Sequence, residues 1–96
     1  MTSDELCAIR EQRIIAAYDA VPEYIRDDIC EASAWAKKTL TDHEGSGHQF
    51  YVTAGKDGMV VCSFAKVSWA GDHSGRGMDH AGEAMVMAVC EYLNGG

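Results

Sequence analysis

HQFYVTAGKDGMVVCSFAKVSW, residues 48–69, is the stretch that decides the fold class. His48 to Ala54 is rich in aromatic and β-branched residues, which predicts a β-strand. Gly55-Lys56-Asp57-Gly58 then supplies turn residues, including glycines that are free to take positive φ. Met59 to Trp69 again has strand character, so we expect the two runs to pair as a β-hairpin.

This hairpin has to be covered, because a two-stranded hairpin is only marginally stable by itself. Alternation along the second strand places apolar side chains on both of its faces: Val61, Ala65, Val67 and Trp69 on one, and Val60, Cys62 and Phe64 on the other. We expect one face to pack on helices. The other face then requires a third short strand, another subunit or a partner.

Two helices are predicted before the hairpin. Thr2 and Glu5 have the spacing of a capping box, which predicts a helix from about Ser3 to about Ala20. Val21-Pro22 interrupts that helix, since proline disfavours helical geometry in the residue before it and fits a first helical turn. A second helix is therefore predicted from Pro22 to about Thr41, with one apolar stripe formed by Ile25, Ile29, Ala32, Ala36 and Leu40.

The chain after the hairpin predicts a loop and a last helix. Ala70 to Gly77 is polar and rich in glycine, and Met78 to Leu93 has a broad apolar arc that ends at the C-cap residues Asn94-Gly95-Gly96. The small residues Ala81, Gly82 and Ala84 are expected to allow close approach to the sheet. The order is ααββα, so we predict one α+β domain over residues 1–96, a length too short for a second core.

The composition limits the classes of partner. Eight Lys and Arg against fifteen Asp and Glu give a formal net charge of −7. That charge disfavours direct binding to nucleic acid or to an anionic membrane and favours a basic protein partner; alternatively, it only maintains solubility. No apolar run approaches the roughly 20 residues that span a bilayer, and no signal peptide is recognisable. We therefore expect a cytoplasmic protein with reduced thiols.

No motif for catalysis, metal binding or nucleotide binding is present, so we expect no enzyme activity, no metal and no cofactor. The cysteines are each more than twenty residues apart, whereas structural zinc sites draw their ligands in close pairs; they are Cys7, Cys30, Cys62 and Cys90. A small enzyme that uses His73, His80 or one of the cysteines is the third-ranked class of function.

The second helix offers the strongest candidate for partner binding. Glu23, Asp27 and Glu31 follow one another at intervals of four residues, opposite the apolar stripe, and beside them lie Tyr24, Asp28 and Trp35. Carboxylates in a row can imitate phosphates on a basic surface, and aromatic side chains can anchor an interface. We expect these six residues to bind a partner, with further contacts from the loop residues Asp72, His73 and Arg76.

Residues 75–93 resemble the end of a double-stranded-RNA-binding domain, in which a hairpin leads through a glycine-containing loop into an alanine-rich helix. The lysine cluster of that family is missing at the helix start, where this chain has Met78-Asp79-His80. Direct RNA binding by that route is therefore not expected, because phosphates would meet no cations.

The whole chain resembles the small inhibitors carried by bacteriophages, including anti-CRISPR proteins, in being short, acidic and without enzyme motifs. The hairpin from Phe50 to Trp69, followed by a helix rich in alanine and methionine (Ala81, Ala84, Met85, Met87 and Ala88), is also similar to members of that group. The resemblance implies a protein that blocks the nucleic-acid-binding surface of a defence complex inside a bacterial host cell.

A structural or regulatory homodimer is the alternative. The first helix has no single narrow apolar face, because Leu6, Ile9, Ile14, Ala17 and Tyr18 are spread around it. Either this helix packs on two sides or part of it meets another chain. Together with the surplus apolar face of the hairpin, this pattern keeps self-association open.

Overall fold

Helices pack on one face of a small antiparallel sheet in the structure, a computed structural model that describes residues 1–95. The fold is α+β and confirms the predicted order ααββα, with the second helix in two pieces and a third short strand present. The elements are α1 (Ser3–Ala20), α2 (Glu23–Arg26), α3 (Ile29–Glu44), β1 (His48–Ala54), the single 3-10 turn η1 (Lys56–Gly58), β2 (Val60–Lys66), β3 (His73–Ser74) and α4 (Ala81–Asn94).

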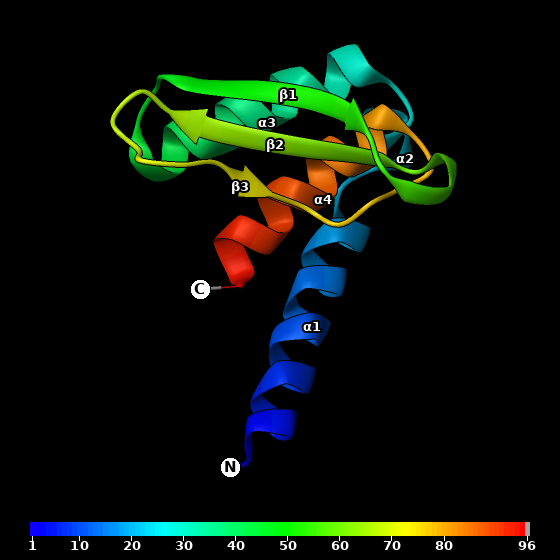
Figure 1. The fold of residues 1–96 in the computed structure, drawn as a ribbon, viewed down its shortest axis with the longest axis vertical. Coiled ribbons are helices and arrows are strands. Elements are labelled where there is room, and N and C mark those ends of the chain that lie inside the picture. Colours follow the sequence, from blue (N-terminus) through cyan, green and yellow to red (C-terminus); the bar gives the residue numbers. More distant parts are fainter. Residues whose placement is uncertain (96) are drawn as a thin grey trace.

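The sheet has the order β1-β2-β3, and both pairings are antiparallel (Figure 1). The predicted hairpin is present: Phe50 lies opposite Phe64 in the β1–β2 pair, and Phe64 lies opposite His73 in the β2–β3 pair. The chain turns between β1 and β2 through Asp57 and Gly58, which both have positive φ, at 58° and 76°. Figure 1 shows α3 and α4 together behind the sheet, so the core lies between these helices and β2.

The second strand is shorter than predicted, and this changes the position of Trp69. β2 ends at Lys66, where a turn follows and leaves Val67 88% exposed. The alternation of faces therefore stops before Trp69, whose ring packs 5.9 Å from Phe64 and 5.4 Å from Tyr92, between centroids. The prediction that Trp69 lies on the face opposite Phe64 was wrong.

The helix predicted from Pro22 to Thr41 is two helices, because Asp28 acts as an N-cap. Asp28 has extended backbone geometry, and its Oδ1 accepts hydrogen bonds from the backbone N–H groups of Cys30 at 2.8 Å and Glu31 at 3.3 Å. An aspartate in this position satisfies donors that a helix start leaves free. The break turns Ile29 outward, out of the predicted stripe, while Ala32, Ala36 and Leu40 are fully buried as expected.

α4 is the most buried element. Every residue from Ala84 to Cys90 is buried, and α1, α3 and β2 all pack on it. The helix starts at Ala81 rather than Met78, because Met78 exchanges two backbone hydrogen bonds with Val60 and so extends the sheet.

The close approach predicted for the small residues of α4 exists, but at Gly82 it is made to α2 and not to the sheet. A Cβ atom at Gly82 would lie 2.3 Å from the carbonyl oxygen of Arg26. A Cβ atom at Gly75, in the loop before α4, would lie 2.7 Å from the Cα atom of Ala88. Both contacts are backbone approaches that only glycine permits.

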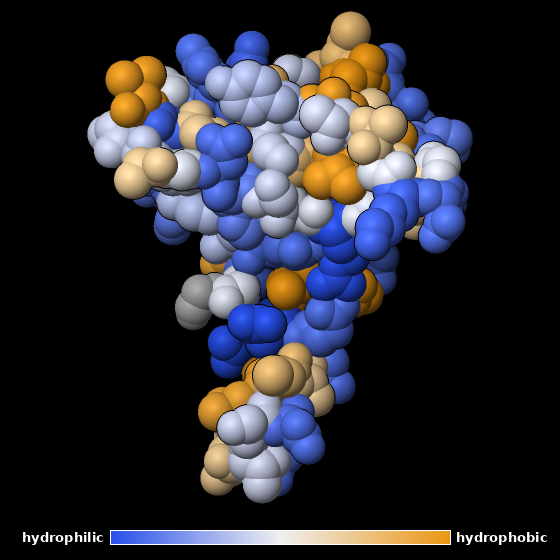
Figure 2. Space-filling model, viewed as in Figure 1, coloured by the Kyte–Doolittle hydropathy of each residue, from blue (hydrophilic) through white to orange (hydrophobic). Residues whose placement is uncertain are grey.

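α1 divides into a packed half and a projecting half. Ile14 and Tyr18 are buried against the rest of the fold, whereas every residue from Met1 to Ala8 is exposed, Leu6 to 56%. Figure 1 shows the helix running away from the body, and Figure 2 shows hydrophobic groups on its projecting end. The absence of a single apolar face in the sequence thus corresponds to a helix that packs over only part of its length.

Gly82→Ala is expected to destabilise the fold by about 1–3 kcal/mol, because the new methyl group would overlap a backbone carbonyl that cannot move alone. Urea denaturation followed by circular dichroism measures this loss. Gly71→Ala is the matched control, since a Cβ atom there meets open space. Equal stability of the two variants would contradict the close contact between α2 and α4.

Candidate functional site

The six residues predicted to bind a partner lie on α2, on the α2–α3 junction and on the first half of α3. Glu23, Asp27, Asp28 and Glu31 are all exposed, and we call these four residues the acidic corner. Tyr24 is 67% exposed and available for contact. Trp35 differs, because it is half-buried and packs against the core. The structure therefore keeps the carboxylates and one of the two predicted aromatic anchors on the surface.

The start of α4 adds residues to this region that the sequence did not indicate. The contact of Gly82 with the Arg26 carbonyl holds the start of α4 against the α2–α3 junction. A shallow cleft of about 450 Å³ results, lined by Asp27, Ile29, His80, Ala81 and Gly82. Asp79 and His80, at the entrance to α4, are both exposed. The sequence feature that could have indicated this contact was Gly82, a glycine in the first turn of an otherwise alanine-rich helix.

The acidic corner forms no ion pair within residues 1–95, although Arg26 on α2 interacts electrostatically with Glu23. The ion pairs of this part of the chain lie elsewhere: Lys38 with Asp42, Glu44 with His48 and Lys66, and Arg76 with Glu11 and Glu91. Arg26, the cation of α2, instead donates a hydrogen bond of 2.9 Å to the Val21 carbonyl and stacks 4.8 Å from the centre of the Tyr18 ring. The negative potential of these exposed carboxylates is therefore accessible to a positively charged partner.

The loop residues predicted to make further contacts have separate roles. Asp72 is exposed. His73 is half-buried in β3, with its ring 5.3 Å from that of Phe64 and 5.4 Å from that of Tyr92. Its Nε2 atom is buried without a hydrogen-bond partner among the residues described.

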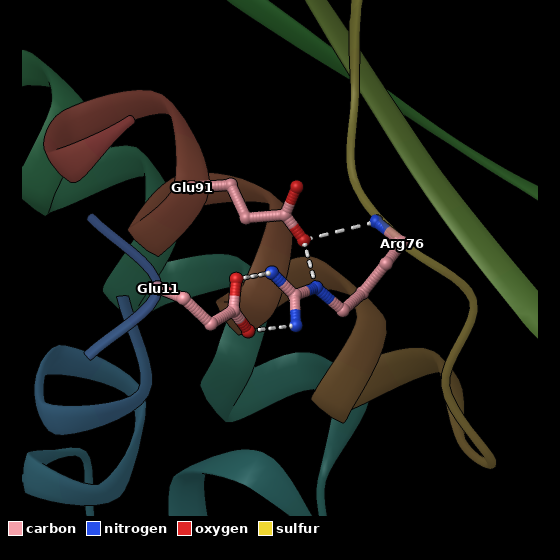
Figure 3. A network of polar contacts seen from close by, with 3 residues as sticks. All are labelled: Glu11, Arg76 and Glu91. Atoms are coloured by element: carbon pink, nitrogen blue, oxygen red, sulfur yellow. Dashed lines mark hydrogen bonds and ion pairs between the residues drawn. The ribbon is translucent and has the colours of Figure 1, made fainter. Parts of the chain in front are cut away.

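Arg76 holds three segments together (Figure 3). Its terminal nitrogens donate to the Glu11 carboxylate at 2.5 and 2.8 Å, and its Nε donates to Glu91 at 2.8 Å. The hydrogen bonds from Arg76 hold the pKa of Glu11 below its usual value. Paired donation of this kind suits the planar guanidinium group. Arg76 thus joins α1 and α4 through the loop, and its charge is already matched.

A second polar cluster, around Glu44 at the end of α3, is also structural and was not predicted. The Glu44 carboxylate accepts hydrogen bonds from the Tyr92 hydroxyl and, at 3.0 Å, from Nε2 of His48, whose side chain is only 2% exposed. Lys66 donates to the Glu44 backbone carbonyl at 2.7 Å. Burial would raise the pKa of Glu44, but the hydrogen bonds from Tyr92 and His48 outweigh it and leave the pKa below its usual value.

The cysteines fall into two pairs. Cys62 and Cys90 are buried, and burial raises the pKa of each thiol to about 11, so both are protonated and weakly nucleophilic at neutral pH. Cys7 and Cys30 are exposed. Over residues 1–95, no three His, Cys, Asp or Glu side chains are grouped in a way that would hold a metal ion.

Comparisons with protein-family models, with curated proteins and with solved structures found no match for this chain. In the described part of the chain, none of the helices has both the length and the apolar character that crossing a bilayer requires. The functional argument therefore depends on the surface itself.

Arg76→Ala is expected to lower the free energy of unfolding by about 1–2 kcal/mol, because it removes charge-assisted hydrogen bonds from two carboxylates. Lys38→Ala breaks an ion pair between exposed side chains and should change stability much less than Arg76→Ala does. Urea denaturation of both variants makes the comparison. An equal loss would show that the Arg76 cluster does not fasten α1 to α4.

Glu44→Gln is expected to destabilise the protein at pH 7 by about 1–2 kcal/mol, because the hydrogen bonds to a charged acceptor are lost. The pKa of Glu44 is lower in the folded protein than in the unfolded chain, so the ionised group stabilises the fold above about pH 4.3. This stabilisation disappears as the pH falls through the folded-state value.

The difference between wild type and Glu44→Gln should therefore shrink on acidification, as measured by urea denaturation at pH 7 and at successively lower pH. Asp42→Asn, which changes an exposed carboxylate two residues earlier, provides the control. A difference that stayed constant down to pH 3 would contradict the role assigned to the Glu44 carboxylate.

Proposed function

We propose that this protein is a non-enzymatic binding protein whose acidic corner occupies a basic, nucleic-acid-binding surface of a partner protein. The observation that carries the proposal is the set of exposed carboxylates on α2 and the start of α3, which form no ion pair within residues 1–95. His80, just before α4, lines a cleft together with Asp27 of this set.

The physical basis is electrostatic complementarity. A surface that binds nucleic acid presents lysine and arginine side chains at the spacing of phosphates, and a row of carboxylates can take the place of those phosphates. The net charge of −7 steers the protein toward such a surface and away from nucleic acid itself. Tyr24 stands beside the carboxylates and offers an amphipathic side chain that can be buried on binding.

The partner class that we propose is a nucleic-acid-binding complex of bacterial defence. This class follows from the resemblance of the sequence to phage-encoded inhibitors of the anti-CRISPR type, and it implies action in the cytoplasm of a host cell. Stoichiometric blocking of a binding surface needs no catalytic group and no cofactor. The proposal is therefore compatible with the structural use of Arg76, Glu44 and His48.

The acidic corner can be neutralised without removing the α3 cap. In the variant Glu23→Gln/Asp27→Asn/Asp28→Asn/Glu31→Gln, the asparagine at position 28 still accepts hydrogen bonds from the helix start. We expect this variant to inhibit target-DNA binding by a purified CRISPR surveillance complex at least about tenfold more weakly than wild type, by loss of about 1.4 kcal/mol or more. Gel-shift titration measures the inhibition, and its potency should fall as the salt concentration rises.

The control variant Asp4→Asn/Glu5→Gln/Asp42→Asn/Asp57→Asn removes the same number of charges from exposed positions outside the acidic corner and outside the predicted loop contacts. It should keep most of the inhibitory activity. The acidic-corner mechanism would be abandoned if both variants were as potent as wild type. Absence of inhibition by the wild-type protein in every complex tested, and in phage plating on hosts with active CRISPR systems, would remove the proposed partner class.

A structural or regulatory homodimer is the second candidate, and a specific observation favours it. The outer edge of β1 has no strand beside it within residues 1–95. That edge and the acidic corner consist of different residues, so one molecule can use both.

A further inference from the structure

β1 is an edge strand without the features that normally protect such strands. Its seven residues, His48 to Ala54, contain no proline and no lysine, arginine, aspartate or glutamate. Edge strands of natural proteins usually carry such residues, because an open row of N–H and C=O groups pairs readily with another strand. Val52, on the face of β1 that points toward the helices, is still 42% exposed.

The hydrogen bonds on the far side of β2 identify the residues of β1 that point outward. Val60 exchanges backbone hydrogen bonds with Met78, and the Cys62 carbonyl accepts one from Gly75, so these two residues of β2 bond away from β1. Ala54 and Val52 lie opposite them and form the non-hydrogen-bonded pairs of the β1–β2 ladder. Their N–H and C=O groups therefore point to the open edge.

By the same alternation, the N–H and C=O groups of His48 and Phe50 also point to the open edge. The outward set thus consists of four residues at regular spacing: His48, Phe50, Val52 and Ala54. The intervening residues Gln49, Tyr51 and Thr53 form the hydrogen-bonded pairs with β2.

One side of α3 is also open in its first half. Glu44 reaches His48 of β1 from this side, and Lys37, Ser33 and Ile29 precede it at intervals that return to the same side of the helix. A shallow depression of about 530 Å³ lies there, lined by Ile29, Cys30, Ser33, Ala34 and Lys37. Most of these side chains are small, so another helix can approach closely.

We infer that two copies of this protein pair their β1 strands antiparallel, about a two-fold axis at Tyr51. In this register Phe50 pairs with Val52 of the second copy and His48 with Ala54 of the second copy, so all four outward residues find partners. The two three-stranded sheets become one continuous sheet.

A second copy fits this edge for reasons of symmetry and chemistry. An axis at Tyr51 lies at the centre of the strand, so the whole length of β1 is used. Pairs of aromatic and β-branched residues such as Phe50 with Val52 stabilise antiparallel strands, and the two Tyr51 rings meet on the outer face. The paired segment carries no formal charge, so the negative charge of each copy does not oppose contact at this edge.

Val52→Lys tests the interface, because it places an inward-pointing charge on the edge strand. Sedimentation equilibrium of the wild-type chain at high micromolar concentration should give twice the monomer mass of 10.4 kDa. Val52→Lys should give the monomer mass. Val67→Lys makes the same chemical change at an 88% exposed residue outside β1 and should leave the dimer intact. A monomeric wild type, or a Val52→Lys variant that still dimerises, would overturn the inference.

Amide hydrogen exchange of the wild-type protein locates the interface without a variant. In the dimer the amides of Phe50, Val52 and Ala54 should be protected, and they should lose this protection on dilution to the monomer. The amides of Tyr51 and Thr53 should remain protected in both states, because they bond to β2. A dimer in which Phe50 and Val52 exchange freely would overturn the inference and place the contact on another surface.

If Val52→Lys does not fold, Ala54→Pro replaces it. Proline removes an outward N–H group and no hydrogen bond to β2, and edge strands tolerate it. The dimer should then dissociate at concentrations at least tenfold higher than wild type. An unchanged dissociation constant of the Ala54→Pro dimer would overturn the inference that β1 forms the interface.

Discussion

The burial of α4 on all sides is the constraint on which the rest of the structure depends. A helix whose residues from Ala84 to Cys90 are all buried cannot lie on the surface of a sheet, as an amphipathic helix can. It needs cover from several directions, and α1, α2, α3 and the sheet provide it. The close packing around α4 also requires glycine at positions 75 and 82, because a side chain at Gly75 or Gly82 would keep the neighbouring backbone away. The fold is therefore a small sheet and three helices arranged around a fourth.

Polar clusters also connect the elements. Arg76 connects α1 with the end of α4, and Glu44 connects α3 with both β1 and α4. Each cluster pairs charged groups with several hydrogen bonds, which limits the cost of partly burying them. Arg76, Lys66 and Arg26 make polar contacts within the fold, whereas the acidic corner forms no ion pair in the described part of the chain.

Local chemistry made much of the fold predictable, and tertiary contacts account for what was missed. The capping box gave the start of α1, and the β-branched and aromatic runs gave the hairpin, because both signals act between near neighbours. Asp28 suits an exposed helix face as well as an N-cap, so its sequence context did not reveal the break. Trp69 depends on a turn at Lys66 that alternation does not show. For the candidate site, the acidic residues could be identified from the sequence, but His80 joins them only through the contact between Gly82 and α2, which is far away in sequence.

α1 belongs to the cooperative folding unit at one end only. Near Ile14 and Tyr18 its hydrogen bonds can open only when the core opens with them, so they share the global stability of the domain. From Met1 to Ala8 the side chains are all exposed, and a free helical segment of this length is marginal in water. A single helix therefore spans most of the range of local stability that a protein of this size can have. Its conformational entropy is concentrated at the projecting end, where binding to any surface would order it.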